Sequence, residues 1–206
     1  GDPEVIPTLK YEDFLKYHEE YYHPSNSYIY IYGDMDVNER LEYLDREYLS
    51  DFDVSDVDIH ANIERQAAFD KPVYETKPYA ITEDESLEDN TYLSYNAVIG
   101  TSVDAKLYLA FQILDYALVM TPGAPVKQAL LDAGISTDVY SSYETSLYQP
   151  VYSIVAKNSN SKEQDRFVSV INDTLEKLVK DGINERTIEA GINYYEFKYR
   201  EADYGP

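Results

Sequence analysis

The sequence predicts an α+β fold in which helices cover one face of an antiparallel sheet. Strand-like segments come in pairs, over about residues 73–81 and 91–100 and over about residues 136–146 and 149–157. Two amphipathic helices follow each pair. A Rossmann-type sheet is disfavoured because strands and helices do not alternate singly, and no glycine-rich phosphate loop is present.

A helix is expected near the N-terminus, over about residues 9–22. Thr8 is a suitable capping residue for its first turn. The helix should end before Pro24, because proline disfavours helical geometry in the residue that precedes it.

A buried strand is expected next, over residues 27–33, because this run is short, apolar and rich in tyrosine and isoleucine. Asp36 and Glu39 form a capping pair for a second helix, which should extend to about residue 50. Residues 51–72 are acidic and show little periodicity, which is typical of a linker.

Four helices are expected in the second part of the chain. Their capping or first-turn residues are Ser102, Pro125, Ser161 and Asn184. Gly134 and Gly182 should end the second and third of these helices, because glycine readily adopts the left-handed conformation found after a helix.

Composition and charge restrict the classes of partner. The chain has 206 residues, is 44% hydrophobic and carries 39 acidic against 17 basic side chains, a formal net charge of −22. One domain or two small ones with a sizeable core are expected. The charge repels phosphate backbones and anionic lipids, so nucleic acid and membranes are not expected partners, whereas a basic peptide or a protein subunit stays open. Without cysteine, disulfides and thiolate catalysis are excluded.

The histidines almost form a zinc motif. His18 and His23 are five residues apart, and on a helix this spacing separates their side chains by about 140°, so one metal ion cannot bridge them. His60 stands alone in an acidic stretch, where a surface position is the simpler interpretation.

No other cluster predicts chemistry. The acidic residues 83–90 lack the spacing of a calcium-binding EF-hand loop, so a solvated loop is favoured. No carboxylate pair stands out as an acid–base couple, and no Gly-x-Ser-x-Gly motif occurs. The sequence therefore predicts no catalytic, metal-binding or cofactor-binding residue within this chain.

Several segments resemble one family when they are taken together and in order. They are residues 1–3, 6–9, 11–12, 21–26 and 32–34, then residues 121–134 with their proline-containing turn, and finally residues 196–205. The chain is similar to the insulinase (pitrilysin) family of zinc metallopeptidases, and specifically to its presequence-protease-like branch.

The resemblance implies an insulinase-family (LuxS/metallohydrolase-like) α-β roll with an incomplete second domain. Residues 1–58 would be the C-terminal end of the first, catalytic domain, and residues 59–206 a large part of the second, non-catalytic domain. Such enzymes hold one zinc ion and cleave unfolded peptides inside an enclosed chamber. Their zinc ligands would lie upstream of Gly1, so this chain would bind no zinc and would be inactive alone.

The resulting expectation is a chamber-forming fragment of a zinc metalloendopeptidase. Its partners would be the remainder of the parent polypeptide and, in the parent, unfolded peptides. The alternative is a non-catalytic peptide-binding or assembly module with the same fold, because fold alone does not set function. Exposed sheet edges would also permit a homodimer of the fragment. No pattern sets the compartment, and a soluble, cytoplasmic protein is the default expectation.

Overall fold

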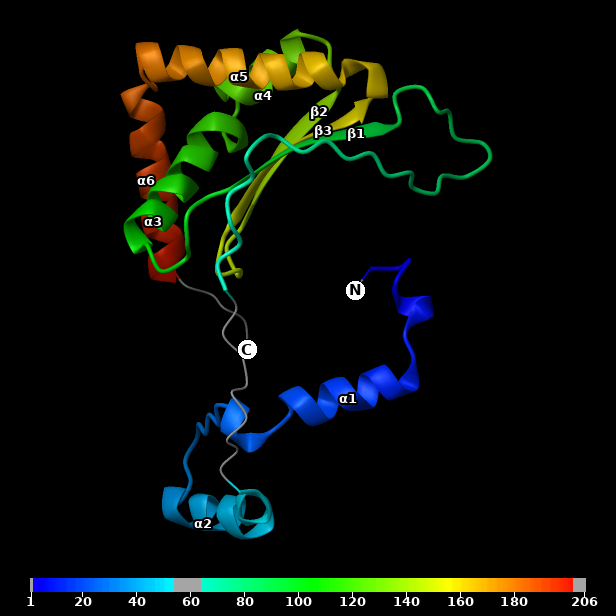
Figure 1. Ribbon diagram of the computed structural model, residues 1–206. Coiled ribbons are helices and arrows are strands. Elements are labelled where there is room, and N and C mark those ends of the chain that lie inside the picture. The colour runs from blue at the N-terminus through cyan, green and yellow to red at the C-terminus, as the bar shows by residue number, and fades with distance from the viewer. Residues whose placement is uncertain (1, 54–63, 202–206) are drawn as a thin grey trace. The chain divides into compact units, whose positions relative to one another are not determined.

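The chain forms two compact units, Gly1–Glu64 and Arg65–Pro206, called here the N-terminal unit and the C-terminal unit. The computed structural model describes residues 2–53 and 64–201 of them (Figure 1). The domain boundary predicted between residues 58 and 59 lies outside the described residues. The assignment of the two parts to two domains of a peptidase stays a prediction.

The described residues of the N-terminal unit include two α-helices, α1 (Tyr11–Tyr21) and α2 (Val37–Glu47). The Asp36 carboxylate accepts hydrogen bonds from the backbone N–H groups of Asn38 and Glu39, so the predicted cap of α2 is confirmed. Short 3-10 turns surround these helices, at Ile6–Thr8, Pro24–Asn26 and Leu49–Asp51.

The predicted cap of the first helix is wrong. The N-cap residue of α1 is Lys10, whose side chain makes no capping hydrogen bond. Thr8 instead lies in the preceding 3-10 turn, where its hydroxyl donates to the carbonyl oxygen of Val5. A threonine hydroxyl can bond to nearby backbone in a turn as well as at a helix cap, and the Thr8 hydroxyl bonds within the turn.

Two predicted strands are not formed. Residues 27–33 and 73–81 have no strand assignment in the described part of the chain. Local β propensity needs a neighbouring strand to become a ladder, and neither segment has one here. At the second segment, the hydroxyl of Tyr79 bonds to the backbone and side-chain oxygens of Asn90.

The C-terminal unit is built on a three-stranded antiparallel sheet (Figure 1). Its strands are β1 (Thr91–Val98), β2 (Asp138–Glu144) and β3 (Val151–Ser159), arranged in the order β1-β3-β2. The register places Tyr143 opposite Tyr152. The second predicted strand pair is therefore confirmed, while only one strand of the first pair forms.

Helices pack on one face of this sheet, so the predicted α+β class is confirmed. They are α3 (Ala105–Asp115), which continues into a π-helical turn (Tyr116–Met120), then α4 (Pro125–Asp132), α5 (Gln164–Asp181) and α6 (Glu185–Glu201). Figure 1 shows α5 running beside α4, and α6 beside α3.

Helix ends agree with the sequence in part. The Asn184 side chain accepts hydrogen bonds at the start of α6, and Gly182 ends α5 with a φ of 85°, both as predicted. The cap of α3 is Asp104, whose carboxylate accepts from the N–H of Leu107, rather than Ser102. Ser161 begins a 3-10 turn that precedes α5 and does not cap the helix.

The core of the C-terminal unit lies between the sheet and the helices. Alternate strand residues face it, with Leu93 from β1, Val139 from β2 and Ile154 from β3. Phe167 and Ile171 of α5 are buried against them. In the N-terminal unit, by contrast, no described residue is buried.

One stretch of the core is long and apolar enough to cross a membrane by length and composition, Ala105–Asp132. In the structure it consists of α3, the π-helical turn and α4, with a turn at residues 121–124. Val119, Val126 and Leu130 from this stretch belong to the core cluster of the C-terminal unit.

Candidate functional site

The two described histidines do not share a site. The ring of His18 stacks on Tyr22, with centroids 4.6 Å apart. The Nδ1 atom of His23 accepts a hydrogen bond from the backbone N–H of Ser25, and its ring meets Phe52 edge-on. His60 lies outside the described residues.

The acidic loop 83–90 uses its carboxylates for local bonding. Glu85 accepts hydrogen bonds from the backbone and hydroxyl of Thr82, and Asp89 accepts one from the side-chain amide of Asn160. Across residues 2–53 and 64–201, no group of three or more histidine, aspartate or glutamate side chains could hold a metal ion. The described residues therefore do not fit a zinc ion, and no catalytic step is assigned through one.

The most unusual polar feature is a buried cluster between α3 and the sheet, called here the Asp115 cluster. It consists of Asp115, Ser141, Tyr143 and Tyr152, each with a buried side-chain oxygen that lacks a hydrogen-bond partner in the described part of the chain. Asp115 is the last residue of α3, immediately before the π-helical turn, and is only 5% exposed. The other three side chains come from β2 and β3 and project from the same face of the sheet.

Burial changes the acidity of this cluster. It raises the pKa of the Asp115 carboxyl, while the nearby hydroxyls of Ser141 and Tyr152 lower it by a smaller amount. Burial, followed by the charge of Asp115, also raises the pKa of Tyr152 well above its usual range. The same two causes raise the pKa of Tyr195 on α6 to about 12. The cluster therefore favours neutral side chains.

Sequence reasoning missed Asp115, although a signal was present. Asp115 lies four residues after Phe111 and three before Leu118, so it falls on the apolar stripe of its helix. An acidic residue on such a stripe indicates either a buried polar contact or a functional group. The π-helical turn that follows could not be predicted from periodicity, because it is a local insertion into the helical hydrogen-bond ladder.

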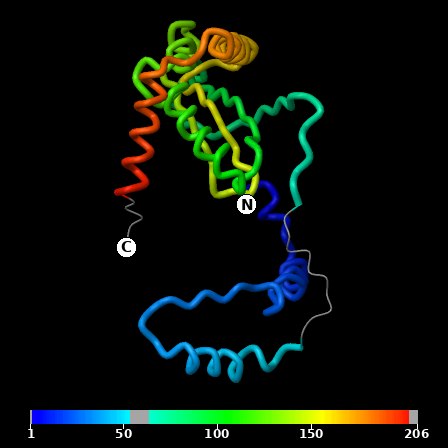
Figure 2. Tube along the Cα trace, turned by 90° about the vertical axis from the view of Figure 1, so that its left-hand side faces the viewer, coloured from blue at the N-terminus to red at the C-terminus, as the bar shows by residue number. Residues whose placement is uncertain are grey.

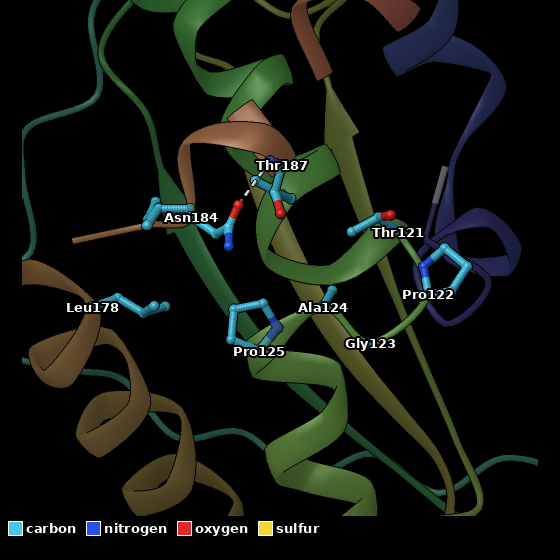
Figure 3. A pocket seen from close by; sticks show the side chains of 10 residues that line it. Thr121, Pro122, Gly123, Ala124, Pro125, Leu178, Asn184 and Thr187 are labelled. Atoms are coloured by element: carbon cyan, nitrogen blue, oxygen red, sulfur yellow. Dashed lines mark hydrogen bonds between the residues drawn. The ribbon is translucent and has the colours of Figure 1, made fainter. Parts of the chain in front are cut away.

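A cavity of about 330 Å³ lies beside the turn that joins the π-helical segment to α4 (Figure 3). Thr121 and Gly123 of that turn line it on one side, and Asn184 and Thr187 at the start of α6 line it on the other. Asn184 is already used as the cap of α6, because its side-chain oxygen accepts from the N–H groups of Arg186 and Thr187. The cavity thus separates the segment 121–134, which carried part of the family resemblance, from α6.

The second face of the sheet is open to solvent within the C-terminal unit. Tyr92 and Val98 of β1 and Tyr140 of β2 are exposed on this face. At its centre, the side-chain oxygen of Asn96 accepts hydrogen bonds from the hydroxyls of Ser94 and Ser153, at 2.9 and 2.6 Å. This open face combines aromatic, aliphatic and neutral polar groups on three neighbouring strands, with charged side chains towards the strand ends, such as Glu144 of β2 and Lys157 of β3, whose Nζ lies over the ring of Tyr92.

The family assignment follows from residues 8–195, which match the family described as the peptidase M16 inactive domain. The chain therefore belongs to the insulinase (pitrilysin) family of metallopeptidases and represents its non-catalytic type of domain. Its relatives place it in the presequence-protease-like branch, so the family predicted from the sequence is confirmed. Peptidases of this family are generally zinc-dependent.

Particular relatives match the chain from end to end. Protein HypA of Clostridium perfringens is 42% identical over 205 residues, which are 100% of this chain and 21% of that protein. Presequence protease 1 of Arabidopsis thaliana, a chloroplastic and mitochondrial protein, is 34% identical over 207 residues, or 100% and 19% of the two chains. The chain thus spans about a fifth of the length of these relatives.

One solved structure gives a more distant comparison. An inactive peptidase domain from Bordetella parapertussis aligns with 56% of this chain and 62% of its own, with 14% identity and a TM-score of 0.49.

Proposed function

We propose that this chain is a non-catalytic, chamber-forming segment of a presequence-protease-like zinc peptidase that degrades unfolded peptides. The observation that carries the proposal is the end-to-end match to about a fifth of Arabidopsis presequence protease 1, in a chain that belongs to the inactive-domain family. Zinc would be held by other parts of the parent polypeptide.

The open face of the sheet is the surface that would line the chamber. A peptide in an extended conformation alternates its side chains with a period of two, which suits a sheet whose exposed residues alternate in the same way. The face carries no acidic side chain at its centre, where Asn96, Ser94 and Ser153 form a neutral network. This neutral centre would contact peptide side chains of varied type.

The negative charge of the whole chain supports the choice of substrate class. A net charge of −22 attracts basic peptides over a distance and repels nucleic acids and anionic membranes. A soluble, cytoplasmic protein remains part of the proposal, whereas the relatives that carry the name presequence protease are mitochondrial or chloroplastic.

The first test is peptide hydrolysis. The purified chain is incubated with zinc and a fluorogenic basic peptide, with Arabidopsis presequence protease 1 as the positive control. We expect no turnover by the chain alone, and zinc-dependent cleavage would overturn the proposal.

The second test replaces the matched fifth of Arabidopsis presequence protease 1 with this chain. We expect this chimera to cleave the peptide. Within it, Tyr140→Arg on the open face should lower kcat/KM about tenfold, because a charged side chain would obstruct a neutral contact surface. Val179→Arg is the matched control, since Val179 is 89% exposed on α5. Equal effects of the two substitutions would contradict a chamber-lining role and favour the alternative, an assembly module.

A further inference from the structure

A highly exposed apolar segment connects α1 to α2 in the N-terminal unit (Figure 2). Tyr28, Tyr30 and Tyr32 are 105%, 85% and 86% exposed, and Ile29 between them is 51% exposed. Tyrosine and isoleucine are favoured in strands, and large apolar side chains in an uninterrupted run are typical of strands covered on both faces. This surface is therefore unusual for a segment that faces only water.

The backbone of this segment is also unused. Among the described residues, no backbone–backbone hydrogen bond involves residues 28–33. Unpaired N–H and C=O groups on an extended, apolar segment form a ready template for pairing with another strand. A neighbouring sheet edge would pair the unbonded backbone groups and would also cover the exposed side chains.

The flanking residues already fix where a strand would begin and end. The side-chain amide of Asn26 donates to the carbonyl oxygen of Tyr21 at the end of α1, and Ser27 leaves that turn in an extended conformation. At the other end, Gly33 has a φ of 138°, and an added Cβ would lie 3.0 Å from the side chain of Met35. Asp36 then caps α2. The unit is thus arranged as helix, extended segment, turn and helix.

We propose that residues 27–33 form a β-strand that adds to the edge of a sheet supplied by the part of the parent polypeptide outside this chain. The tyrosines would cover one face of that sheet and Ile29 and Ile31 the other. This inference rests on the proposed function, in which the chain works as part of a longer peptidase. The relatives supply the length for such a sheet, since about four-fifths of each lies outside the match.

A second copy of this chain is the competing occupant, and charge disfavours it. Residues 1–53 contain 14 acidic and 4 basic side chains, so that part alone carries a net charge of −10. Two such units meeting edge to edge would repel one another, and a dimer of whole chains would bring together two charges of −22. A sheet of lower negative charge is the better partner.

The test measures hydrogen exchange of residues 28–32 in the isolated chain and in the Arabidopsis chimera described above. We expect rapid exchange in the isolated chain and at least tenfold slower exchange in the chimera, because ladder hydrogen bonds protect backbone amides. An active chimera with unchanged exchange would overturn the strand. Protected amides in an inactive chimera would support the strand and count against the proposed function.

A second measurement tests the proposal without the chimera, in case the chimera does not fold. Clostridium perfringens HypA without its matched region is mixed with this chain, and binding is followed by light scattering. We expect binding that Ile31→Asp weakens at least tenfold and that Val73→Asp, at an exposed site of the C-terminal unit, leaves unchanged. Equal effects of both variants, or no binding, would contradict the inference. Protection of residues 28–32 in a dimer of the chain alone would identify a second copy as the occupant instead.

Discussion

The carboxyl group of Asp115 and the hydroxyl group of Tyr152 lie close together inside the C-terminal unit, and both are withdrawn from water. One comes from the end of α3 and the other from β3. Asp115 immediately precedes the π-helical turn, so this contact places the turn against the central strand β3. Neither Oδ1 of Asp115 nor the hydroxyl oxygen of Tyr152 has a hydrogen bond of regular geometry within the described residues. Because burial outweighs the favourable effect of the Tyr152 and Ser141 hydroxyls on the carboxylate, Asp115 opposes folding when it is ionised.

The pH dependence of stability should reveal this cost. The folded-state pKa of Asp115 is raised by burial. Between the ordinary aspartate pKa of about 4 and the raised value, the folded protein binds more protons than the unfolded chain, so the free energy of unfolding falls as pH rises. In Asp115→Asn this contribution is absent, and the variant should gain about 1–3 kcal/mol over the native chain as pH rises from about 4 through the folded-state pKa.

Urea unfolding at a series of pH values measures the difference between the two proteins. Asp173→Asn serves as the control, because Asp173 is an exposed residue of α5. We expect the pH-dependent gain of Asp115→Asn to exceed that of the control. Equal pH dependence of the two variants would show that the Asp115 carboxyl group is not held in an unfavourable environment.

The close packing of α6 on α3 depends on Gly191. An added Cβ would lie 3.2 Å from side-chain atoms of Ile113 and Tyr116. Gly191→Ala should therefore lower the free energy of unfolding by about 1 kcal/mol, although alanine is the better helix former by a similar amount. Thermal unfolding of Gly191→Ala and Gly191→Val tests this, with Ala190→Val on the exposed side of α6 as the control. Stabilisation by Gly191→Ala would mean that the helices lie further apart.

The helices and the three formed strands could be predicted because their signals are local. The alternation of Leu93, Tyr95 and Ala97 marks β1, and Gly134 and Gly182 mark helix ends. Such signals need only a few neighbouring residues and a single buried face.

What could not be predicted depends on distant parts of the chain. Residues 27–33 and 73–81 have the composition of strands, but a strand needs a partner whose position local sequence does not give. The Asp115 cluster has the same origin, because Asp115, Ser141 and Tyr152 meet only after the sheet and α3 pack together. The predicted caps Ser102 and Ser161 are wrong for local reasons. Asp104, two residues after Ser102, caps α3, and Ser161 begins a 3-10 turn that precedes α5.

The end of α4 provides a test of backbone conformation. Gly134 has a φ of 65°, its N–H bonds to the carbonyl of Leu131, and the N–H of Ile135 bonds to the carbonyl of Leu130. These are the two bonds of a Schellman motif. Gly134→Ala should cost about 1 kcal/mol in the free energy of unfolding, and Gly134→Asn less, because asparagine tolerates the left-handed region. Equal losses in urea unfolding would point to a cause other than backbone strain.

Removal of two buried hydroxyl groups should affect the free energy of unfolding differently. The hydroxyl of Ser159 donates a 2.6 Å hydrogen bond to the carbonyl oxygen of Ile135, whereas that of Tyr152 has no such partner in the described part of the chain. Ser159→Ala should lower the free energy of unfolding by about 1–2 kcal/mol, because the carbonyl loses its donor. Tyr152→Phe should leave the free energy of unfolding unchanged or raise it, since a buried polar atom without a partner is replaced by an apolar ring of nearly the same shape.

Tyr140→Phe on the open face controls for the loss of an exposed hydroxyl. A loss in Tyr152→Phe as large as that in Ser159→Ala would mean that Tyr152 donates to a bound water or to Asp115, and that the cluster stabilises the fold.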